Sequence, residues 1–331
     1  MSFQKYKVVV YGFRRARMQK RSFYPIFCPW ARVALPFKTT KKMRTHITVG
    51  IITLLLGWEA PARCQDPIKP YRLAGVFQFD FISKINHQPY RLTVALPFGY
   101  SAEDTVRYPT MYMMDGDPNL PLAALIQWNM TYDGEVPNLI LVGVGYQADN
   151  FMHTVPFRTL DYTPTRDDRA DSEMTAHHHV NMVSGGAGDF LRVMEEEIIP
   201  FIKQHYKANN DQALAGHSFG GLFAAYVLFT HPELFQRYLI SSPSLDWDNH
   251  VIQKMEARYA EGHSSLGVRV FISAGGAEPE SMIPDVRALA TTLAGRHYRG
   301  SEVTAKVFDD ETHLSVIPFA ISRGLRELYR R

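Results

Sequence analysis

Residues 216–220 read Gly-His-Ser-Phe-Gly, and a further glycine, Gly221, follows them. Residues 212–216 are typical of a short buried strand, and residues 222–229 are typical of a helix. A G-x-S-x-G sequence between a strand and a helix matches the nucleophile elbow, a turn so tight that side chains beside the serine would clash. The helix that follows aims its first N–H groups at the reaction centre. The sequence therefore predicts Ser218 as a catalytic nucleophile.

A nucleophilic serine needs a base, and enzymes with such an elbow place the histidine last in the chain, after the acid. Residues 302–308 alternate like a last strand, residues 309–313 form a polar loop, and residues 317–329 resemble a helix with Pro318 in its first turn. His313 therefore lies where the base is expected. The other downstream histidines are in contexts typical of solvated side chains: His231, His250, His263 and His297.

The acid is expected at the carboxyl end of the preceding strand, residues 268–273, where a carboxylate can accept the ring N–H of the base. That strand is followed by Ala-Gly-Gly-Ala-Glu-Pro-Glu at residues 274–280. Glu278 is the best candidate because it comes first after the glycines, where a tight turn can return it to the sheet. Glu280 and Asp285 are the alternatives.

An oxyanion hole must offer two backbone N–H groups to the charge that develops on the substrate carbonyl oxygen. The residue after the nucleophile, Phe219, supplies one of them. The second is expected after an early strand, and residues 108–114 followed by Asp115, Gly116 and Asp117 fit that place. Gly116 and Asp117 are the candidates, although Asp-Gly is also common in ordinary turns.

Residues 147–189 form a long polar stretch that we interpret as a cap over the active site, because loops of this length are usually functional. We expect Arg158 and Tyr162 within it to contact the substrate. The three histidines at residues 177–179 are expected to be a solvated loop and not a metal site, because no carboxylate cluster accompanies them. The glycine-rich residues 184–188 lack the Lys-Ser/Thr ending of a phosphate-binding loop. The sequence predicts no metal and no cofactor.

The remaining pattern indicates an α/β fold. Residues 72–81 and 90–97 are expected to form an antiparallel pair, and residues 139–146 are nearly all apolar, as in a central parallel strand buried on both faces. Residues 190–206 carry apolar side chains at helical spacing, and residues 238–241 add a further strand. The sequence predicts one domain with a mostly parallel central sheet, helices on both faces and a cap insertion.

The first part of the chain has a different composition. Residues 1–42 contain eleven Lys or Arg and no Asp or Glu. Met43 then opens a signal-peptide pattern, with Arg44, a mainly apolar run at residues 47–58 and the cleavage-site sequence Ala-Pro-Ala at residues 60–62. That run is too short to span a bilayer, which needs about 20 residues. We expect residues 1–42 to be an over-extended reading frame or a basic leader, residues 43–62 a signal peptide, and residues 63–331 the domain of a periplasmic or secreted protein.

Charge and cysteine content fit that interpretation. Without residues 1–63 the chain loses 13 of its 36 basic and 1 of its 33 acidic residues, and its net charge becomes −9. An acidic chain gives no support to nucleic-acid binding. Of the two cysteines, only Cys64 would remain, so no internal disulfide is expected. Arg63 before it is unlike the small residue that lipid attachment usually requires.

Several of these motifs resemble a known family, the esterases of the α/β-hydrolase superfamily that include the enterobactin and bacillibactin siderophore esterases, with esterase D more distant. The resemblance runs from about Tyr71 to the C-terminus. It implies an α/β-hydrolase fold, Glu278 as the acid, a cap region near Arg158 and backbone donors near residues 115–116. It does not fix the substrate, because relatives act on siderophore trilactones, feruloyl esters and simple acyl esters. The motifs are at residues 111–116, 161–164, 184–186, 216–223, 242–245 and 276–279.

The sequence therefore predicts an exported serine hydrolase that cleaves carboxylic esters through a Ser-His-Glu triad and an acyl-enzyme intermediate. Its partner is expected to be a small-molecule ester, with no nucleic acid and no stable membrane insertion. Two alternatives remain: an acyltransferase on the same scaffold, and a non-catalytic binding protein. The presence of all three triad candidates, Ser218, His313 and Glu278, argues against the second.

Overall fold

A mixed eight-stranded sheet organises the residues that the structure, a computed structural model, describes: 71–103, 105–279 and 281–330. The strand order is β1-β2-β4-β3-β5-β6-β7-β8. β1 pairs antiparallel with β2, β2 pairs antiparallel with β4, and all other neighbours are parallel. The predicted leader and signal peptide lie outside the described residues. The strands are β1 (Val76–Ile82), β2 (Pro89–Ala95), β3 (Tyr108–Met114), β4 (Ile140–Tyr146), β5 (Ala208–His217), β6 (Arg237–Ser241), β7 (Arg269–Gly275) and β8 (Glu302–Phe308).

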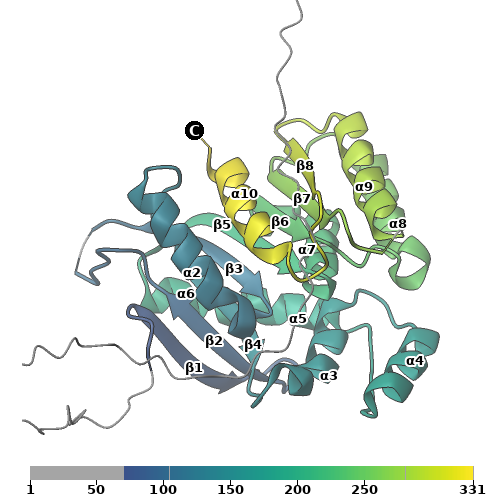
Figure 1. The fold of residues 1–331 in the computed structure, drawn as a ribbon, viewed down its shortest axis with the longest axis horizontal. Helices are drawn as coiled ribbons and strands as arrows, with labels where there is room; N and C mark the ends of the chain where they lie inside the picture. The colour runs from purple at the N-terminus through teal and green to yellow at the C-terminus, as the bar shows by residue number, and fades with distance from the viewer. Residues whose placement is uncertain (1–70, 104, 280, 331) are drawn as a thin grey trace, which may run out of the picture. The chain divides into compact units, whose positions relative to one another are not determined.

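Helices cover both faces of this sheet, as predicted (Figure 1). On one face lie α2 (Gly116–Tyr132) and α10 (Ile317–Tyr329), and most other helices pack on the opposite face. No helix among the described residues is long and apolar enough to cross a membrane. The other helical elements are α3 (Phe151–Tyr162), α4 (Asp168–His178), α5 (Ala187–Val193), the π-helical turn η1 (Met194–Ile198), α6 (Ile199–His205), α7 (Phe219–Thr230), the 3₁₀ turn η2 (Pro232–Leu234), α8 (Trp247–Gly262) and α9 (Met282–Arg296).

Strand β4, in the middle of the sheet, is buried along its whole length, because helices cover both of its faces. In β3, Met111 and Met113 pack with α2 and α10, whereas Tyr112 and Met114 belong to the core on the other face. This alternation follows from the two-residue period of a strand. It explains why near-continuous apolar runs in the sequence correspond to central strands.

The cap region differs from the predicted loop. Residues 147–189 contain two helices, α3 and α4, which begin at side-chain caps: Asn150 accepts the N–H of His153, and Asp167 accepts those of residues 169 and 170. The composition of α4 is so polar that its apolar periodicity is weak, which is why it resembles a loop in the sequence. The N-cap residues Asn150 and Asp167 were the signal in the sequence from which the two helices could have been predicted. The predicted helix at residues 190–206 is also divided, since the π-helical turn η1 joins α5 to α6.

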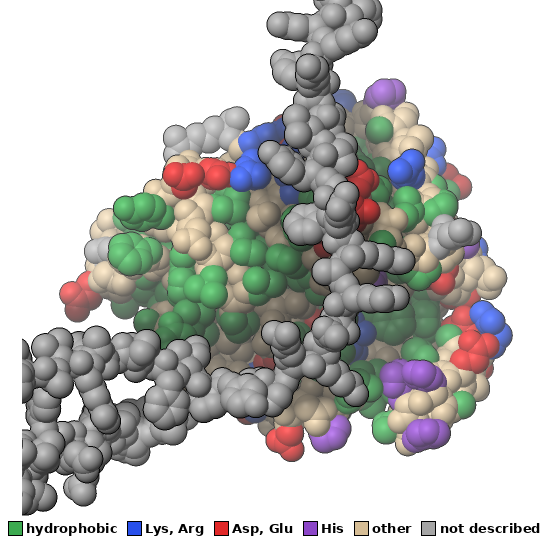
Figure 2. Space-filling view, in the orientation of Figure 1, with side chains coloured by type: hydrophobic (Ala, Val, Ile, Leu, Met, Phe, Trp, Pro, Cys, Tyr) green, Lys and Arg blue, Asp and Glu red, His purple; other side chains and the backbone are tan. Residues whose placement is uncertain are grey.

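Hydrophobic side chains are exposed on the side of the molecule that carries α2 and α10 (Figure 2). Leu125 on α2 is 47% exposed and Phe319 on α10 is 45% exposed. Such scattered apolar residues are common on protein surfaces and need no binding partner to explain them.

A buried carboxylate attaches the cap to the sheet. Asp161 of α3 is almost fully buried, and its Oδ2 accepts hydrogen bonds from the hydroxyls of Tyr90 on β2 at 2.6 Å and Tyr146 on β4 at 3.1 Å. Burial raises the pKa of Asp161 to about 7, although the two tyrosine hydrogen bonds oppose the shift. The carboxyl group is therefore protonated in the folded protein over a pH range in which it is ionised in the unfolded chain.

We expect the free energy of unfolding to depend on pH because Asp161 has different pKa values in the folded protein and in the unfolded chain. As pH rises from about 4 to about 7, the unfolded chain loses the Asp161 proton and the folded chain keeps it, so the free energy of unfolding falls, by on the order of 4 kcal/mol in total. Asp161→Asn removes this contribution. Urea unfolding of both proteins at pH 4.5 and pH 8 checks it: the advantage of the wild type over the variant should be larger at the lower pH. An equal difference at both values would contradict the assignment.

Candidate active site

Ser218 lies at the turn from β5 to α7, in a conformation that few non-glycine residues adopt. Its φ is 58° and its ψ is −120°, and the turn is held by a 3.0 Å hydrogen bond from its N–H to the carbonyl of Ser241. A Cβ on Gly216 would come within 2.0 Å of the Gly220 carbonyl oxygen, and one on Gly221 within 2.9 Å of the Ser241 carbonyl oxygen. Gly216 and Gly221 are therefore required by the close approach of backbone to backbone.

His313 and Glu278 come together beside the elbow, from the loop after β8 and the turn after β7. Nδ1 of His313 is 3.7 Å from Oε2 of Glu278, an ion-pair distance slightly longer than a hydrogen bond. The Glu278 side chain is fully buried and that of His313 is 34% exposed. The imidazole can thus meet a substrate on one side and the carboxylate on the other.

The other carboxylate oxygen of Glu278 is held by two donors. Oε1 accepts the hydroxyl of Ser242 at 2.5 Å and the N–H of Gly275 at 3.0 Å. Burial alone would raise the pKa of Glu278, but the contact with His313 and the bonds from Ser242 and Gly275 outweigh it and lower the pKa below its usual value. Glu278 is therefore an ionised carboxylate facing His313.

Ser242 was not singled out in the sequence as a functional residue. It directly follows β6, it is fully buried, and its φ of 42° lies in the left-handed region. Its N–H donates to the Ser273 carbonyl at 2.7 Å. The only signal in the sequence was its place in the motif at residues 242–245, which does not reveal that its hydroxyl faces Glu278.

The alternative acid and base candidates lie elsewhere. Asp285 pairs with His250, at 3.2 Å between Oδ1 and Nε2, whereas the carboxylate beside His313 is that of Glu278. Glu280 lies outside the described residues. His231 is the C-cap residue of α7, and His297 is the C-cap residue of α9. His263 contacts the Tyr259 carbonyl at 3.0 Å.

The two turns predicted to carry the oxyanion hole touch each other. Phe219 begins α7, and Gly116 begins α2, so the N–H groups of residues 219, 116 and 117 all belong to first helical turns, which have no intrahelical acceptor. A Cβ on Gly220 would lie 2.9 Å from Cβ of Met114 and 3.5 Å from Oδ2 of Asp115. The structure thus brings the predicted donors to the same edge of the sheet.

Arg158 and Tyr162 occupy different places from those expected of substrate contacts. The Arg158 guanidinium binds both carboxylate oxygens of Asp115, each at 2.8 Å, and its carbon lies 5.4 Å from the centre of the Phe219 ring. Tyr162 is fully buried, and its hydroxyl accepts the Asp115 N–H at 3.1 Å. Both side chains therefore fix Asp115, at the N-cap of α2, and Tyr162 offers no surface to a substrate.

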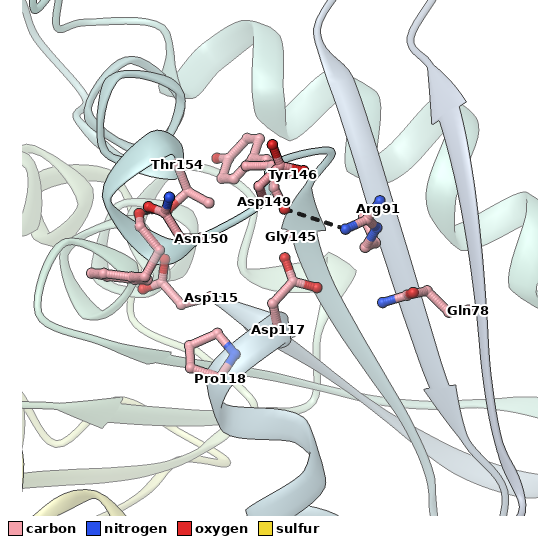
Figure 3. Close-up of a pocket in the computed structure, with 12 residues that line it drawn as sticks. Gln78, Arg91, Asp115, Asp117, Pro118, Gly145, Tyr146, Asp149, Asn150 and Thr154 are labelled. Carbon is pink, nitrogen blue, oxygen red and sulfur yellow. Dashed lines mark hydrogen bonds between the residues drawn. The ribbon is translucent and has the colours of Figure 1, made fainter. Parts of the chain in front are cut away.

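Two pockets adjoin these turns. One, of about 250 Å³, is lined by Asp115, Asp117 and Asp149 together with Arg91, which donates to the Ala148 carbonyl at 3.4 Å (Figure 3). Burial raises the pKa of Asp117. The other pocket, of about 420 Å³, is bounded by Phe219 of the elbow, by Trp247 and by residues 167–173 of the cap. Trp247 Nε1 also donates to the Thr165 carbonyl at 3.1 Å, which attaches the cap to this wall.

The run of histidines at residues 177–179 was predicted to be a loop, but it forms the end of a helix. His177 and His178 end α4, and His179 is its C-cap residue with a φ of 57°. Across residues 71–103, 105–279 and 281–330, no three His, Cys, Asp or Glu side chains are grouped so that they could hold a metal ion.

Comparison with known proteins places the chain in a family. Residues 83–309 match the model of the family described as "Putative esterase". The chain is similar to the ferri-bacillibactin esterase BesA of Bacillus subtilis, at 30% identity over 233 residues, which covers 66% of this chain and 78% of that protein. It is also similar to a siderophore enterobactin esterase of Emericella nidulans, at 27% identity over 59% of this chain and 66% of that protein.

Comparison with solved structures supports the same family. The fold is similar to the BES protein from Bacillus cereus, with a TM-score of 0.71 and 26% identity, over 80% of this chain and 99% of that one. An IroE-like serine hydrolase from Shewanella oneidensis gives a TM-score of 0.66 at 25% identity, over 77% of this chain and 80% of that one. The predicted α/β-hydrolase fold is thereby confirmed. The chain belongs to the esterase family, together with the siderophore esterases, and it is a carboxylic ester hydrolase.

Proposed function

We propose that the chain hydrolyses its ester through a catalytic triad of Ser218, His313 and Glu278 and an acyl-enzyme intermediate. The observation that carries this proposal is the placement of the three residues at one edge of the sheet: Ser218 is at the elbow, and the buried Glu278 carboxylate is 3.7 Å from Nδ1 of His313. His313 is the base that takes the serine proton, and Glu278 stabilises the imidazolium that results.

In the first step the Ser218 hydroxyl oxygen attacks the ester carbonyl carbon, and its proton passes to Nε2 of His313. The N–H of Phe219 and those of Gly116 or Asp117 hold the developing oxyanion. Collapse of this intermediate breaks the bond to the alcohol oxygen, which takes the proton from His313. Water then gives a proton to His313 and attacks the acyl carbon of the acyl-enzyme. The bond between this carbon and the Ser218 oxygen breaks, the carboxylic acid leaves, and Ser218 takes its proton back from His313.

An organophosphate that phosphorylates activated serines, with loss of its leaving group, tests this mechanism directly. The purified protein should gain one phosphoryl group, and peptide mass spectrometry should locate it on Ser218, with loss of esterase activity in proportion to labelling. Labelling of another serine, or full activity in the labelled protein, would overturn the proposal.

We infer that the substrate is a siderophore ester, because relatives with 30% and 27% identity are named as siderophore esterases. A panel of iron-free and ferric siderophore esters, feruloyl esters and simple acyl esters tests this inference by comparing kcat/KM. Added alcohols also show whether water or an alcohol takes the acyl group. A preference of more than tenfold for feruloyl or simple esters would contradict the assignment.

We also propose that the protein is exported after cleavage near Arg63. The support is the pattern of Arg44, the apolar run at residues 47–58 and the Ala-Pro-Ala sequence at residues 60–62. N-terminal sequencing of the protein from the periplasm or medium should find a chain that begins near residue 63. An exported chain that retains Arg32 or Lys38 would show that the basic leader is part of the protein.

A further inference from the structure

His217, the residue directly before the nucleophile, contacts the ring of the base. It ends β5, and its ring centre lies 4.5 Å from that of His313, with the ring planes tilted by 44°. Nδ1 of His217 lies 3.2 Å from the hydroxyl of Ser241, the residue opposite it on β6. Its ring also borders a cavity of about 20 Å³ that Ile317 and Ile321 of α10 line. His217 is therefore held at the end of β5 by its contact with β6.

His313 is more open to solvent, since its side chain is 34% exposed. It lies between β8 and α10 on a turn in which the neighbouring residues 312, 314 and 315 are exposed. Its ring meets Glu278 only at 3.7 Å. A ring on an exposed turn, with one long contact to its acid, needs a second surface to keep its orientation while it gains and loses a proton. A displacement of about 1 Å in a catalytic group can cost about a hundredfold in rate.

The charge state of His217 suits this role. Burial, together with the positive charges of His313 and Arg158, lowers the pKa of His217 to about 3, against an opposing effect of Glu278. His217 is consequently neutral when His313 is protonated, and two imidazolium rings never face each other at 4.5 Å.

We propose that His217 is a positioning residue, a neutral aromatic ring that holds the imidazole of His313 in line between Ser218 and Glu278. This proposal rests on the triad proposed above. It assigns the effect to the ring surface of His217 and not to proton transfer by its nitrogens.

Variants at residue 217 test the proposal. His217→Ala should lower kcat by about 10- to 100-fold with KM changed less than threefold, because substrate binding does not depend on the orientation of the base. His217→Phe keeps a ring of similar size and should restore kcat to within about threefold of the wild type. The rate of Ser218 labelling by the organophosphate should follow the same order, since it too needs the base.

His231→Ala is the matched control, because it removes a half-buried histidine at the other end of α7. It should leave kcat unchanged, and urea unfolding should show that all the variants are folded. A folded His217→Ala variant with kcat within threefold of the wild type overturns the proposal, as does a His217→Phe variant as slow as His217→Ala. Failure of the triad itself is distinguishable, since Ser218 would then not be labelled in any of the proteins.

Discussion

Ser218→Ala should lower kcat for ester hydrolysis by on the order of a millionfold, because loss of the nucleophilic hydroxyl leaves only binding and oxyanion stabilisation. KM for the best ester should change little, since Phe219, Gly116 and Asp117 keep their positions at the first turns of α7 and α2. Initial rates measured with the purified variant at high enzyme concentration give the remaining activity.

The substitution should leave stability nearly unchanged. Alanine and serine have a similar cost at a φ of 58°, and no hydrogen bond from the Ser218 hydroxyl to another described residue is lost. Ser172→Ala, on the exposed side of α4, is the control and should be fully active. A folded Ser218→Ala variant with more than about a hundredth of wild-type activity would assign the nucleophile to another residue.

The elbow was predictable because its constraint is local. Gly216, Ser218 and Gly220 lie within five consecutive residues, and the clash that excludes a side chain at residue 216 arises with Gly220, four positions later. The place of His313 was predictable for a related reason, since parallel strands end at the same edge of the sheet, so a loop after the last strand approaches the elbow.

The supporting contacts were not predictable, because they join residues far apart in the chain. Ser242 and Glu278 are separated by 36 residues, and their hydrogen bond depends on how the turns after β6 and β7 face each other. Arg158 was predicted to contact the substrate from its place in the cap region. Its pairing with Asp115, 43 residues earlier, appears only once α3 is packed against the elbow.

Glu278→Gln should lower kcat by about 10⁴-fold, the size of effect that an acid-to-amide change has in another triad enzyme, with little change in KM. Gln can still accept the bonds from Ser242 and the Gly275 N–H through its oxygen. Its NH₂ group would then face Nδ1 of His313, which favours the wrong ring tautomer and provides no charge to stabilise the imidazolium.

Asp285→Asn is the matched control, because it removes a second carboxylate downstream of β7 that pairs with His250 and not with His313. It should change kcat by less than about threefold. The pH dependence of stability gives an independent measurement: the lowered pKa of Glu278 contributes stability above the pKa of the unfolded chain, and this is lost as pH falls through the folded value. Glu278→Gln should therefore lose less stability than the wild type on acidification below about pH 4. If Asp285→Asn were the slow variant and Glu278→Gln were nearly as active as the wild type, the acid would be Asp285, and the loop after β7 would have to rearrange during catalysis.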